Sequence, residues 1–436
     1  MANQKSNKLT RRSFINKSFI GAAGLSVMPA FKGFSANDNL NFGFIGMGQQ
    51  AMFLLNGFIN IEGVKVVAGC DVFGIKRTRF ENRVNDFYTK KGTSVDVKTY
   101  ERYQDLLARP DIDAVVIAVP DHWHALIAID ALAAGKDVYL EKPLTFTIKE
   151  GQELVKAVRK YDRILGVGSQ QRSDPAFQHA VKLVHDGELG DIEKAYAYVG
   201  GPPKPYDLPR EILPADLNWD LWLGPNPYVH YNHELAPPIS LDPPKNEQIW
   251  GAWRWYKEMG GGFTTDWGAH MFDIVQWGLK MDKSGPVEII PAGYNKYEYL
   301  TYKYANGITM TEEPFNSKKT KGVKFVGKDG WIEVSRGFWN ASDKKYNPNL
   351  EKESGPYETK IPHQLNFVES VRARKDPQVP VETGHRTCTV CTLGNIAYDL
   401  RRPVKWNPAN EKFVDDLQAE LYMHRQYRKG YKLTEF

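Results

Sequence analysis

The stretch Asn41-Phe-Gly-Phe-Ile-Gly-Met-Gly-Gln-Gln-Ala51 is typical of a short buried strand, a glycine turn and the start of a helix. Within it, Gly46, Gly48 and Ala51 follow the G-x-G-x-x-G/A spacing of a dinucleotide-binding turn. Gly46 permits the tight turn, Gly48 allows the backbone to approach a pyrophosphate, and Ala51 allows close packing of the helix on the strand. The N-terminus of the helix then offers N–H groups and a favourable dipole to the phosphates.

This turn alone is a weak signal, and the next predicted strand strengthens it. Residues 64–70 are a second apolar run, and Asp71 follows it, 20 positions after Ala51. A carboxylate at that place accepts hydrogen bonds from the ribose hydroxyls and repels a 2′-phosphate, which indicates NAD. Lys76 and Arg77 follow closely and keep NADP open as the cofactor, although a solvated helix face explains these two cations better.

The strand–helix rhythm continues along the chain. Residues 114–119 are a continuous apolar run, as in parallel strands that are covered on both faces. An Ala-rich helix is expected at 125–134, and the next strand at 137–140. Ligands of such sheets bind beyond the carboxyl ends of the strands. The residues expected beside the cofactor at these ends are Pro120, His124, Glu141 and Lys142.

Two of these positions allow other interpretations. Lys142 stands between a strand and Pro143, on a turn that the proline makes rigid, which suits a side chain that faces the nicotinamide. An ordinary surface lysine is the alternative. His122 and His124 could be metal ligands, but no carboxylate–histidine cluster accompanies them at a useful spacing. We therefore expect no metal site, and a place for His124 at a helix start beside the cofactor.

The stretch Asp266-Trp-Gly-Ala-His270 follows three glycines at 260–262. On a helix, positions i and i+4 lie on one face, so Asp266 and His270 would converge on one site. Histidine titrates near neutral pH, which suits a general acid or base. Asp273 would orient the imidazole or pair locally. Taken alone, this pattern is equally typical of a buried helix histidine with a surface partner.

Together these motifs resemble those of the Gfo/Idh/MocA family (glucose–fructose oxidoreductase and inositol dehydrogenase), from about Leu40 to Trp406. The most specific matches are Glu141-Lys142-Pro143 and the pair Asp266 and His270. The resemblance implies an NAD(P)-dependent oxidoreductase that acts on CH–OH groups of a sugar or polyol. It also implies that Lys142, Asp266 and His270 are catalytic, with His270 as the proton acceptor. Family members often dimerise through an open sheet face, which implies a homo-oligomer.

The fold class expected is an α/β Rossmann domain at 37–165, followed at 166–405 by an α+β domain with a large, mostly antiparallel open-faced sheet. Strand-like runs begin at Ala195 and at 287, 298, 307, 323 and 331, and Asn306-Gly307 and Asp329-Gly330 are strong hairpin turns. A Pro/Trp-rich loop at 200–255 is expected to shape the mouth of the site. Polar side chains at 171–173 and Gly384-His385-Arg386 are further candidates for substrate contact. Residues 406–436 form a C-terminal tail with no evident chemistry.

The positive charge is concentrated at the N-terminus. Of the formal net charge of +5, residues 1–36 contribute six Lys and Arg and no Asp or Glu, which leaves −1 for the remainder. With a net charge near zero, the remainder of the chain has no general positive surface for binding nucleic acid. Thr10-Arg-Arg-Ser-Phe-Ile15, followed by a weakly apolar stretch, resembles a twin-arginine signal and predicts a periplasmic or otherwise exported protein that holds its cofactor tightly. No run is long enough for a membrane anchor.

Three functions remain open on the sequence. The favoured one is hydride transfer between a tightly held NAD(P) and a sugar, a polyol or a related hydroxyl substrate. The alternative is an NAD-dependent glycosidase that oxidises and re-reduces the sugar transiently, although Glu141-Lys142-Pro143 departs from that branch. A non-catalytic sensor of sugar or nucleotide is the third, and intact Lys142, Asp266 and His270 oppose it.

Overall fold

The computed structural model describes residues 39–241, 249–349 and 360–436. The glycine turn at residues 46–48 joins β1 (Leu40–Ile45) to α2 (Gln49–Phe58). Gly46 has φ +83°, and a Cβ atom there would lie 2.5 Å from the carbonyl oxygen of Ala118. Only glycine meets both conditions without strain. The predicted N-terminal signal segment, residues 1–36, lies outside the described residues.

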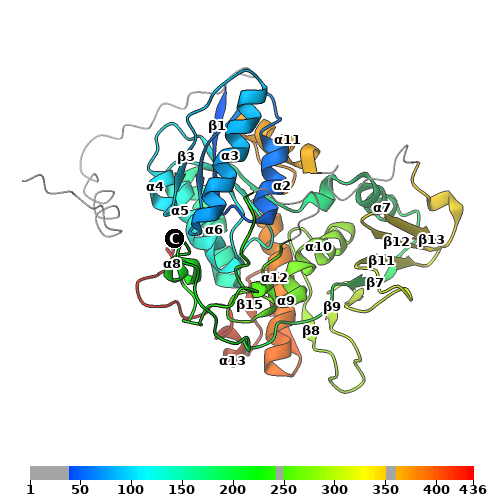
Figure 1. The fold of residues 1–436 in the computed structure, drawn as a ribbon. Coiled ribbons are helices and arrows are strands. Elements are labelled where there is room, and N and C mark those ends of the chain that lie inside the picture. Colours follow the sequence, from blue (N-terminus) through cyan, green and yellow to red (C-terminus); the bar gives the residue numbers. More distant parts are fainter. Residues whose placement is uncertain (1–38, 242–248, 350–359) are drawn as a thin grey trace, which may run out of the picture.

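In the described residues, the first sheet has six strands, all parallel, in the order β3-β2-β1-β4-β5-β6. Their bounds are β2 (Val64–Cys70), β3 (Lys98–Tyr100), β4 (Ala114–Ile117), β5 (Asp137–Leu140) and β6 (Leu165–Val167). Figure 1 labels β1 and β3 of this sheet. Because both faces are covered, the central strands are apolar throughout, as predicted at 114–119. The predicted Rossmann fold is confirmed.

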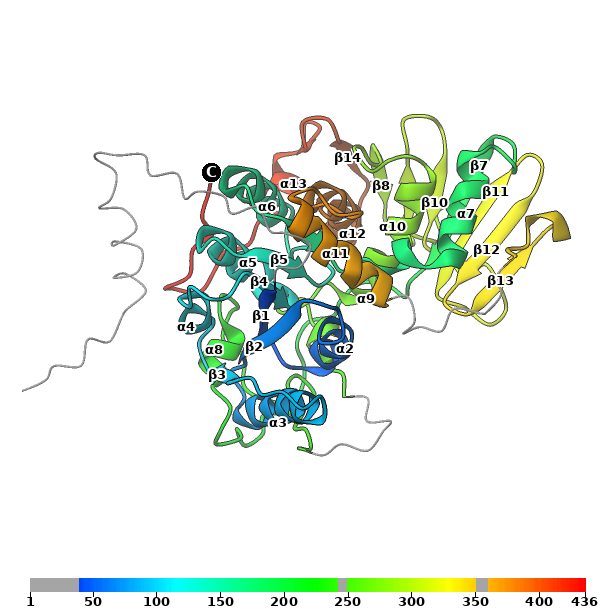
Figure 2. The same cartoon turned by 90° about the horizontal axis from the view of Figure 1, so that it is seen from above.

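Helices cover the two faces of this sheet in separate sets (Figure 2). One face packs against α4 (Tyr103–Leu107), α5 (His124–Ala133) and α6 (Ile148–Tyr161). The other packs against α2, α3 (Gly74–Lys90) and α11 (Lys360–Ala373). Helix α11 comes from the C-terminal part of the chain, so the first domain is completed by residues far along the sequence.

The second sheet has nine strands in the order β13-β12-β11-β7-β10-β9-β8-β14-β15. In the described residues, all of its pairs are antiparallel except β7 with β10. The strands are β7 (Ile192–Tyr198), β8 (Glu288–Ile290), β9 (Thr301–Lys303), β10 (Thr309–Thr311), β11 (Gly322–Gly327), β12 (Trp331–Ser335), β13 (Phe338–Ala341), β14 (Val404–Asn407) and β15 (Lys412–Phe413). The predicted mostly antiparallel sheet is therefore confirmed.

One face of this sheet packs against helices α7 (Pro175–His185), α10 (Gly268–Gly278) and α12 (Val381–Leu400) (Figure 2). Ala195 and Ala197 of β7 are fully buried against them, whereas Lys194 and Tyr196 alternate with these alanines and point to the opposite face. This period of two is the one a sheet with a single packed face requires. The sheet is open-faced, as predicted.

Helix α12 lies between the domains. Its Cys388 is buried in the Rossmann core and its Cys391 in the core of the second domain, and both thiols are free. The remaining helices and 3-10 turns are α8 (Trp219–Leu223), α9 (Gly262–Asp266), α13 (Leu417–Glu420), η1 (Asp121–Trp123), η2 (Gln170–Ser173), η3 (Ala252–Trp255) and η4 (Lys344–Tyr346). Across the described ranges, no helix is long and apolar enough to cross a membrane.

The segment 406–436 packs onto both domains. Trp406 and Phe413 belong to the core of the second domain, and Leu433 packs into the core beside α5. Arg428 donates to Asp220 Oδ1 at 2.6 Å and to the carbonyl of Gly224 at 3.0 Å. The end of the chain thus fastens part of the loop 200–255 to the Rossmann domain.

Candidate active site

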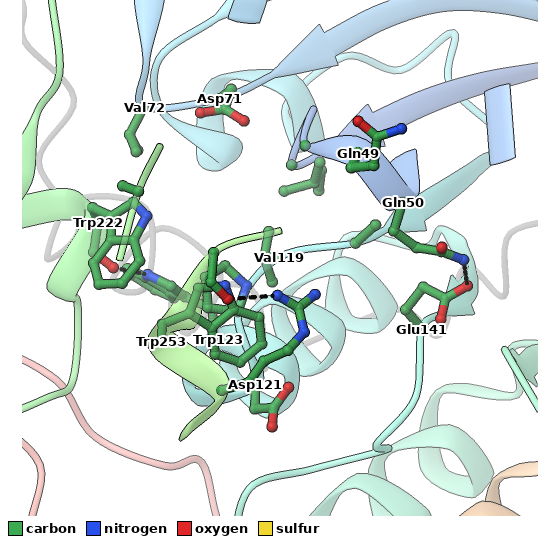
Figure 3. A pocket seen from close by; sticks show the side chains of 18 of the residues that line it. Gln49, Gln50, Asp71, Val72, Val119, Asp121, Trp123, Glu141, Trp222 and Trp253 are labelled. Atoms are coloured by element: carbon green, nitrogen blue, oxygen red, sulfur yellow. Dashed lines mark hydrogen bonds between the residues drawn. The ribbon is translucent and has the colours of Figure 1, made fainter. Parts of the chain in front are cut away.

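A cavity of about 860 Å³ opens beyond the carboxyl ends of β1, β2, β4 and β5 (Figure 3). Its other walls come from the loop 200–255, from α9 and α10, and from residues 429–431. Eight of the ten predicted site residues line it: Gly46, Gly48, Asp71, Pro120, Glu141, Lys142, Asp266 and His270. The sequence motifs from both domains therefore meet in one space.

The glycine turn forms a cradle at one end of this cavity. Gly48 caps α2 without a side-chain hydrogen bond, and a Cβ atom built on it would meet nothing within 4 Å. The space beside the helix N-terminus is therefore open to an anion, with backbone N–H groups directed at it. These residues fit the pyrophosphate of a dinucleotide.

Asp71 follows the second strand at the same end. Its carboxylate accepts hydrogen bonds from the backbone N–H of Met47 at 2.8 Å and of Phe73 at 2.9 Å, which fix its orientation beside the glycine turn. A carboxylate has further lone pairs that can accept from ribose hydroxyls. Arg77 donates to the backbone carbonyl of Asp71, whereas Lys76 lines the cavity.

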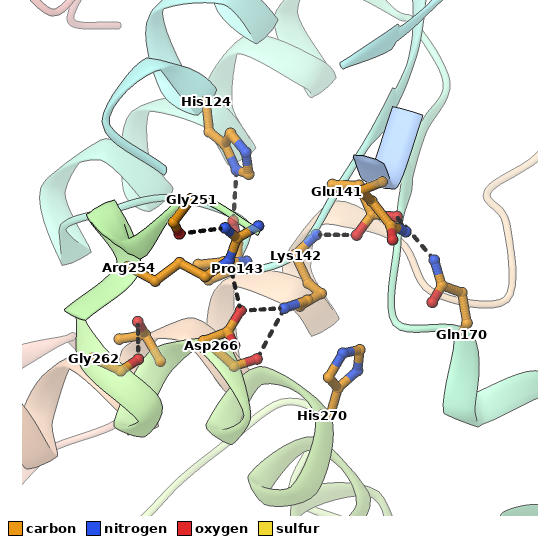
Figure 4. Close-up of polar contacts among 12 residues, drawn as sticks. His124, Glu141, Lys142, Pro143, Gln170, Gly251, Arg254, Gly262, Asp266 and His270 are labelled. Atoms are coloured by element: carbon orange, nitrogen blue, oxygen red, sulfur yellow. Dashed lines mark hydrogen bonds and ion pairs between the residues drawn. The ribbon is translucent and has the colours of Figure 1, made fainter. Parts of the chain in front are cut away.

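Glu141 lies between the two domains, where β5 ends. Its Oε1 atom accepts from Gln50 Nε2 at 2.7 Å and from Gln170 Nε2 at 2.8 Å (Figures 3 and 4). Gln50 belongs to the first turn of α2, and Gln170 follows β6. The buried carboxylate thus ties the phosphate-binding helix to the strand that carries Lys142.

Lys142 reaches across the cavity to Asp266 (Figure 4). Its Nζ atom lies 2.7 Å from Asp266 Oδ1 and 3.0 Å from the Asp266 carbonyl oxygen, while Arg254 Nε lies 3.5 Å from the same Oδ1. Burial disfavours the charged carboxylate, but the charges of Lys142 and Arg254 outweigh it and hold the pKa of Asp266 below its ordinary value. The ion pair is therefore formed at neutral pH.

His270 and Asp266 both line the cavity, but one continuous helix does not carry them. Helix α9 ends at Asp266, and α10 begins at Gly268. The prediction of one continuous helix is wrong in this detail, because the helix is interrupted at Trp267, although both side chains still reach the same cavity. The imidazole is buried, and its Nε2 atom lies 3.1 Å from Nη2 of Arg336.

Asp273 forms its hydrogen bonds with Arg172 and Thr387. Its two carboxylate oxygens accept from Nε and Nη2 of Arg172, each at 2.8 Å, and Oδ1 also accepts from the Thr387 hydroxyl at 2.7 Å. Arg172 is itself buried and contacts Asp282 as well. Of the two roles expected for Asp273, the structure shows local pairing, which joins α10 to η2.

Two predicted cofactor residues lie outside the cavity lining. Ala51 is fully buried in the core under α2, which agrees with its packing role. His124 is buried, with Nδ1 2.7 Å from the carbonyl of Pro143 and Nε2 3.0 Å from that of Val119. Its ring therefore contacts the backbone of the turn that carries Lys142 and does not line the cavity.

Of the further candidates for substrate contact, Gln171 lies beside His270 and Arg336, whereas the others pair elsewhere. His385 and Arg386 pair with Glu411 at 2.9 Å and 2.7 Å, outside the cavity lining. Ser173 bonds to His363. Of the loop tryptophans, Trp222, Trp250, Trp253 and Trp255 line the cavity, whereas Trp219 stacks on Trp222 beneath it.

Sequence reasoning missed three charged residues of the site. Asp121, Arg254 and Arg336 all line the cavity. Burial raises the pKa of Asp121 to about 7, although the charge of nearby Arg254 opposes the shift. For Asp121, the Pro-Asp-His-Trp-His run at a strand end was an available signal, whereas nothing in the sequence connects Arg254 or Arg336 with His270.

Within the described ranges, no group of three or more side chains of metal-ligand type converges, so the structure offers no metal site there.

A Rossmann sheet with an open glycine cradle, joined to an open-faced sheet whose helices bring an aspartate and a histidine to the same cavity, defines a two-domain NAD(P)-binding oxidoreductase. Residues 40–169 match the family model described as "Oxidoreductase family, NAD-binding Rossmann fold", and residues 193–433 match "Oxidoreductase family, C-terminal alpha/beta domain". The chain belongs to the Gfo/Idh/MocA oxidoreductase family.

Individual relatives match this chain over part of its length or at low sequence identity. A glycosyl hydrolase family 109 protein from Shewanella sp. (strain ANA-3) is 37% identical over 225 residues, which cover 51% of this chain and 47% of that protein. The similarity thus spans about half the length of that curated relative. Myo-inositol 2-dehydrogenase from Lactobacillus plantarum has 19% identity and a TM-score of 0.56, with 84% of this chain and 99% of that chain covered. Levoglucosan dehydrogenase in complex with NADH has 18% identity and a TM-score of 0.58 at the same coverage.

Proposed function

We propose that this protein transfers a hydride between a tightly held nicotinamide cofactor and a hydroxyl-bearing carbon of a sugar or polyol. The observation that carries the proposal is the meeting of Lys142, Asp266 and His270 in the cavity that also holds the glycine cradle. The dehydrogenases that share this fold act on inositol and levoglucosan, by their names, and support a substrate with several hydroxyl groups.

In the proposed alcohol oxidation, His270 and Lys142 have different roles. The bound cofactor supplies a hydride acceptor, so the carbon loses a hydrogen with two electrons while its hydroxyl loses a proton, and a carbonyl results. His270 takes that proton. Lys142, held by Asp266, donates a hydrogen bond to the substrate oxygen as negative charge develops on it. In the reverse direction the same groups return the proton to the oxygen.

NAD is the cofactor we favour over NADP. Asp71 lies at the ribose end of the cavity with its carboxylate fixed by Met47 and Phe73. A 2′-phosphate would bring like charges together there. Lys76 lines the same end and offsets part of this repulsion, so the preference rests on Asp71.

A redox-neutral glycosidase is the second candidate. The 37% identity to a family 109 glycosyl hydrolase favours it, and the same hydride transfer followed by its reversal would serve it. The two functions differ in their products. A dehydrogenase accumulates a carbonyl product and a reduced cofactor, whereas the glycosidase releases an alcohol and leaves the cofactor oxidised.

One experiment distinguishes these functions. The purified protein is denatured to identify any retained nucleotide, and the native protein is mixed with free sugars, polyols and glycosides. We expect NAD to be released, and free sugars or polyols to raise the absorbance of reduced nicotinamide. Cleavage of glycosides without net reduction would support the glycosidase instead. A protein that binds the sugars and changes neither them nor the cofactor would be a sensor.

We propose further that the chain is exported through the twin-arginine route and acts in the periplasm. Arg11 and Arg12 followed by a weakly apolar stretch support this. Because free nicotinamide nucleotides are scarce outside the cytoplasm, the cofactor would be loaded before export and retained.

The open face of the second sheet, with Lys194 and Tyr196, supports a homo-oligomer formed through that face.

The export proposal predicts a clear result in cells. Replacing Arg11 and Arg12 together by Lys is expected to leave the protein in the cytoplasm with its nucleotide bound, because the route reads the paired arginines. Cell fractionation with immunodetection measures this. Replacing Lys5 and Lys8 by Arg is the control, since it keeps the charge and leaves the pair intact. Equal export of both variants would contradict the proposal.

A further inference from the structure

Arg336 reaches His270 from the second sheet. It lies in the tight turn between β12 and β13, where Gly337 has φ +65° and Ser335 pairs with Phe338. From there its guanidinium lies over the ring of Trp267, with Cζ 5.1 Å from the centroid. Nη2 is 3.1 Å from His270 Nε2, and Arg336 itself lines the cavity.

This contact occupies one of the two ring nitrogens that could take the proton in the proposed reaction. A guanidinium only donates hydrogen bonds, so His270 Nε2 must accept with its lone pair, and a neutral ring then carries its proton on Nδ1. With the Gln171 amide turned so that its oxygen accepts from Arg336 Nε at 3.1 Å and Nη2 at 2.9 Å, that oxygen lies 3.1 Å and the amide nitrogen 2.6 Å from His270 Nδ1, so Gln171 contacts the other ring nitrogen. The described arrangement leaves Nε2 engaged with Arg336. For Nε2 to take a proton from substrate, the guanidinium must move.

The charges around His270 favour an anion. Four cationic side chains surround this end of the cavity: Lys142, Arg254, Arg336 and Lys321, the last lying over the lining rings of Phe263 and Trp267. Burial lowers the pKa of Lys321, although the charge of Asp266 opposes the shift. Three carboxyl groups face these cations, namely Asp121, Glu141 and Asp266, and the pKa of Asp121 is raised to about 7. Positive charge therefore exceeds negative by one to two units.

We propose that the substrate is a sugar acid whose carboxylate binds Arg336, and that this binding draws the guanidinium away from His270 Nε2. The inference rests on the proposed oxidoreductase function and names its substrate class. A hydroxyl group of a neutral sugar cannot match the paired, charge-assisted hydrogen bonds that a carboxylate forms with a guanidinium. The indole of Trp267, which Arg336 covers in this arrangement, then offers an apolar face to the sugar ring.

The test compares matched substrates on the enzyme with its nucleotide bound. D-glucuronate is compared with D-glucose, D-galacturonate with D-galactose, and glucose 6-phosphate serves as a phosphate-bearing probe. We expect the sugar acids to have kcat/KM values roughly 10- to 100-fold above those of the neutral partners, the range for a hydrogen-bonded charge. Binding to the form with reduced nucleotide, measured by calorimetry, provides a readout that does not depend on turnover.

The variants R336Q and R336K complete the test. R336Q is expected to lose the preference for the acid in both kcat/KM and binding, while R336K retains part of it through its charge. K328Q is the control, because Lys328 is exposed and pairs with Asp191 outside the cavity. Thermal unfolding of each variant checks that the fold is kept. A preference that survives in R336Q would overturn the role of Arg336.

The outcomes separate the inference from the function on which it rests. Neutral sugars that react as well as their acids would overturn the sugar-acid proposal and leave the oxidoreductase intact. A preference for the phosphate over both acids would likewise overturn the choice of a carboxylate. Sugar acids that bind through Arg336 without any reduction of the nucleotide would support the anion site and contradict the proposed redox function.

Discussion

Replacing His270 by Ala is expected to slow reduction of the bound nucleotide by about 10²–10⁴-fold, the usual contribution of a general base. The imidazole is buried in the cavity wall beside Trp267, with ring centroids 5.9 Å apart, and no other histidine lines the cavity among the described residues. Without it, the substrate hydroxyl must lose its proton to water or to a poorer base. A single-turnover experiment that follows the absorbance of the reduced nicotinamide measures the effect on hydride transfer itself.

Two further variants separate the loss of a base from damage to the site. His270→Gln keeps an acceptor for Arg336 but provides no group that titrates near neutral pH, so it should be as slow as the alanine variant. His185→Gln is the matched control, because His185 bonds to the carbonyl of Trp277 at 2.9 Å, outside the cavity lining. Retained nucleotide in all three variants would show that cofactor binding is intact. A single-turnover rate close to that of the wild type in His270→Ala would exclude His270 as the base.

The residues that the sequence placed correctly are those whose positions depend on local chain geometry. Gly46 and Gly48 act through the backbone of one turn, and Asp71 and Lys142 each follow a strand of a parallel sheet. The carboxyl ends of such strands lie at one edge, so a strand-end residue is brought to the site by the fold itself. Asp266 and His270 reached the cavity although the helix between them breaks, because the two short helices follow one another closely.

The sequence does not predict the direction in which a side chain points. His124 does stand at a strand end and a helix start, as predicted, but its ring turns inward to the carbonyls of Val119 and Pro143. A buried ring N–H needs an acceptor, and one of these two carbonyls provides it, since a neutral ring donates from one nitrogen only. Asp273 likewise satisfies Arg172, a residue 101 positions earlier in the chain. Neither partner could be chosen from spacing along the sequence.

Arg336 could not be predicted because long-range strand pairing places it. The register of β12 on β13, and of β11 on β7, determines where the turn at Gly337 lies relative to α10. The pairing of β11 with β7 joins segments far apart in the chain, so no local pattern predicts where the short β12–β13 hairpin and its arginine lie. Arg254 depends in the same way on how the loop 200–255 folds over the Rossmann domain. The part of the site that we propose to select the substrate is therefore the part that the sequence does not predict.

Replacing Lys142 by Met should lower both the activity and the stability of the protein. The methionine removes the hydrogen-bond donor to the developing oxyanion, a change that costs about 10²–10³ in kcat where single donors have been removed. Asp266 then keeps the more distant Arg254, at 3.5 Å, and the charge of Lys321. Because both partners of the ion pair are mostly buried, we expect a loss on the order of 1–3 kcal/mol at pH 7, below the full value for a buried pair.

The pH dependence of that loss shows whether charge is its cause. In the wild type the lowered pKa of Asp266 means that the carboxylate adds stability above its ordinary pKa of about 4, and that this contribution disappears as the pH falls through the lower, folded-state value. In Lys142→Met the pKa should rise, since burial is then less well opposed, and the charged carboxylate becomes a penalty at neutral pH. Unfolding free energies from denaturant titrations should therefore differ most near pH 7 and converge only as the pH falls below the lowered folded-state pKa of Asp266. Lys149→Met is the matched control, since it breaks the helical pair with Glu153 at 2.8 Å on α6, where Lys149 is one-third exposed. It should lose less than about 1 kcal/mol and keep full activity. A difference between Lys142→Met and the wild type that is equal at every pH would instead assign the loss to packing, and Lys142 would then act in catalysis without holding Asp266 charged.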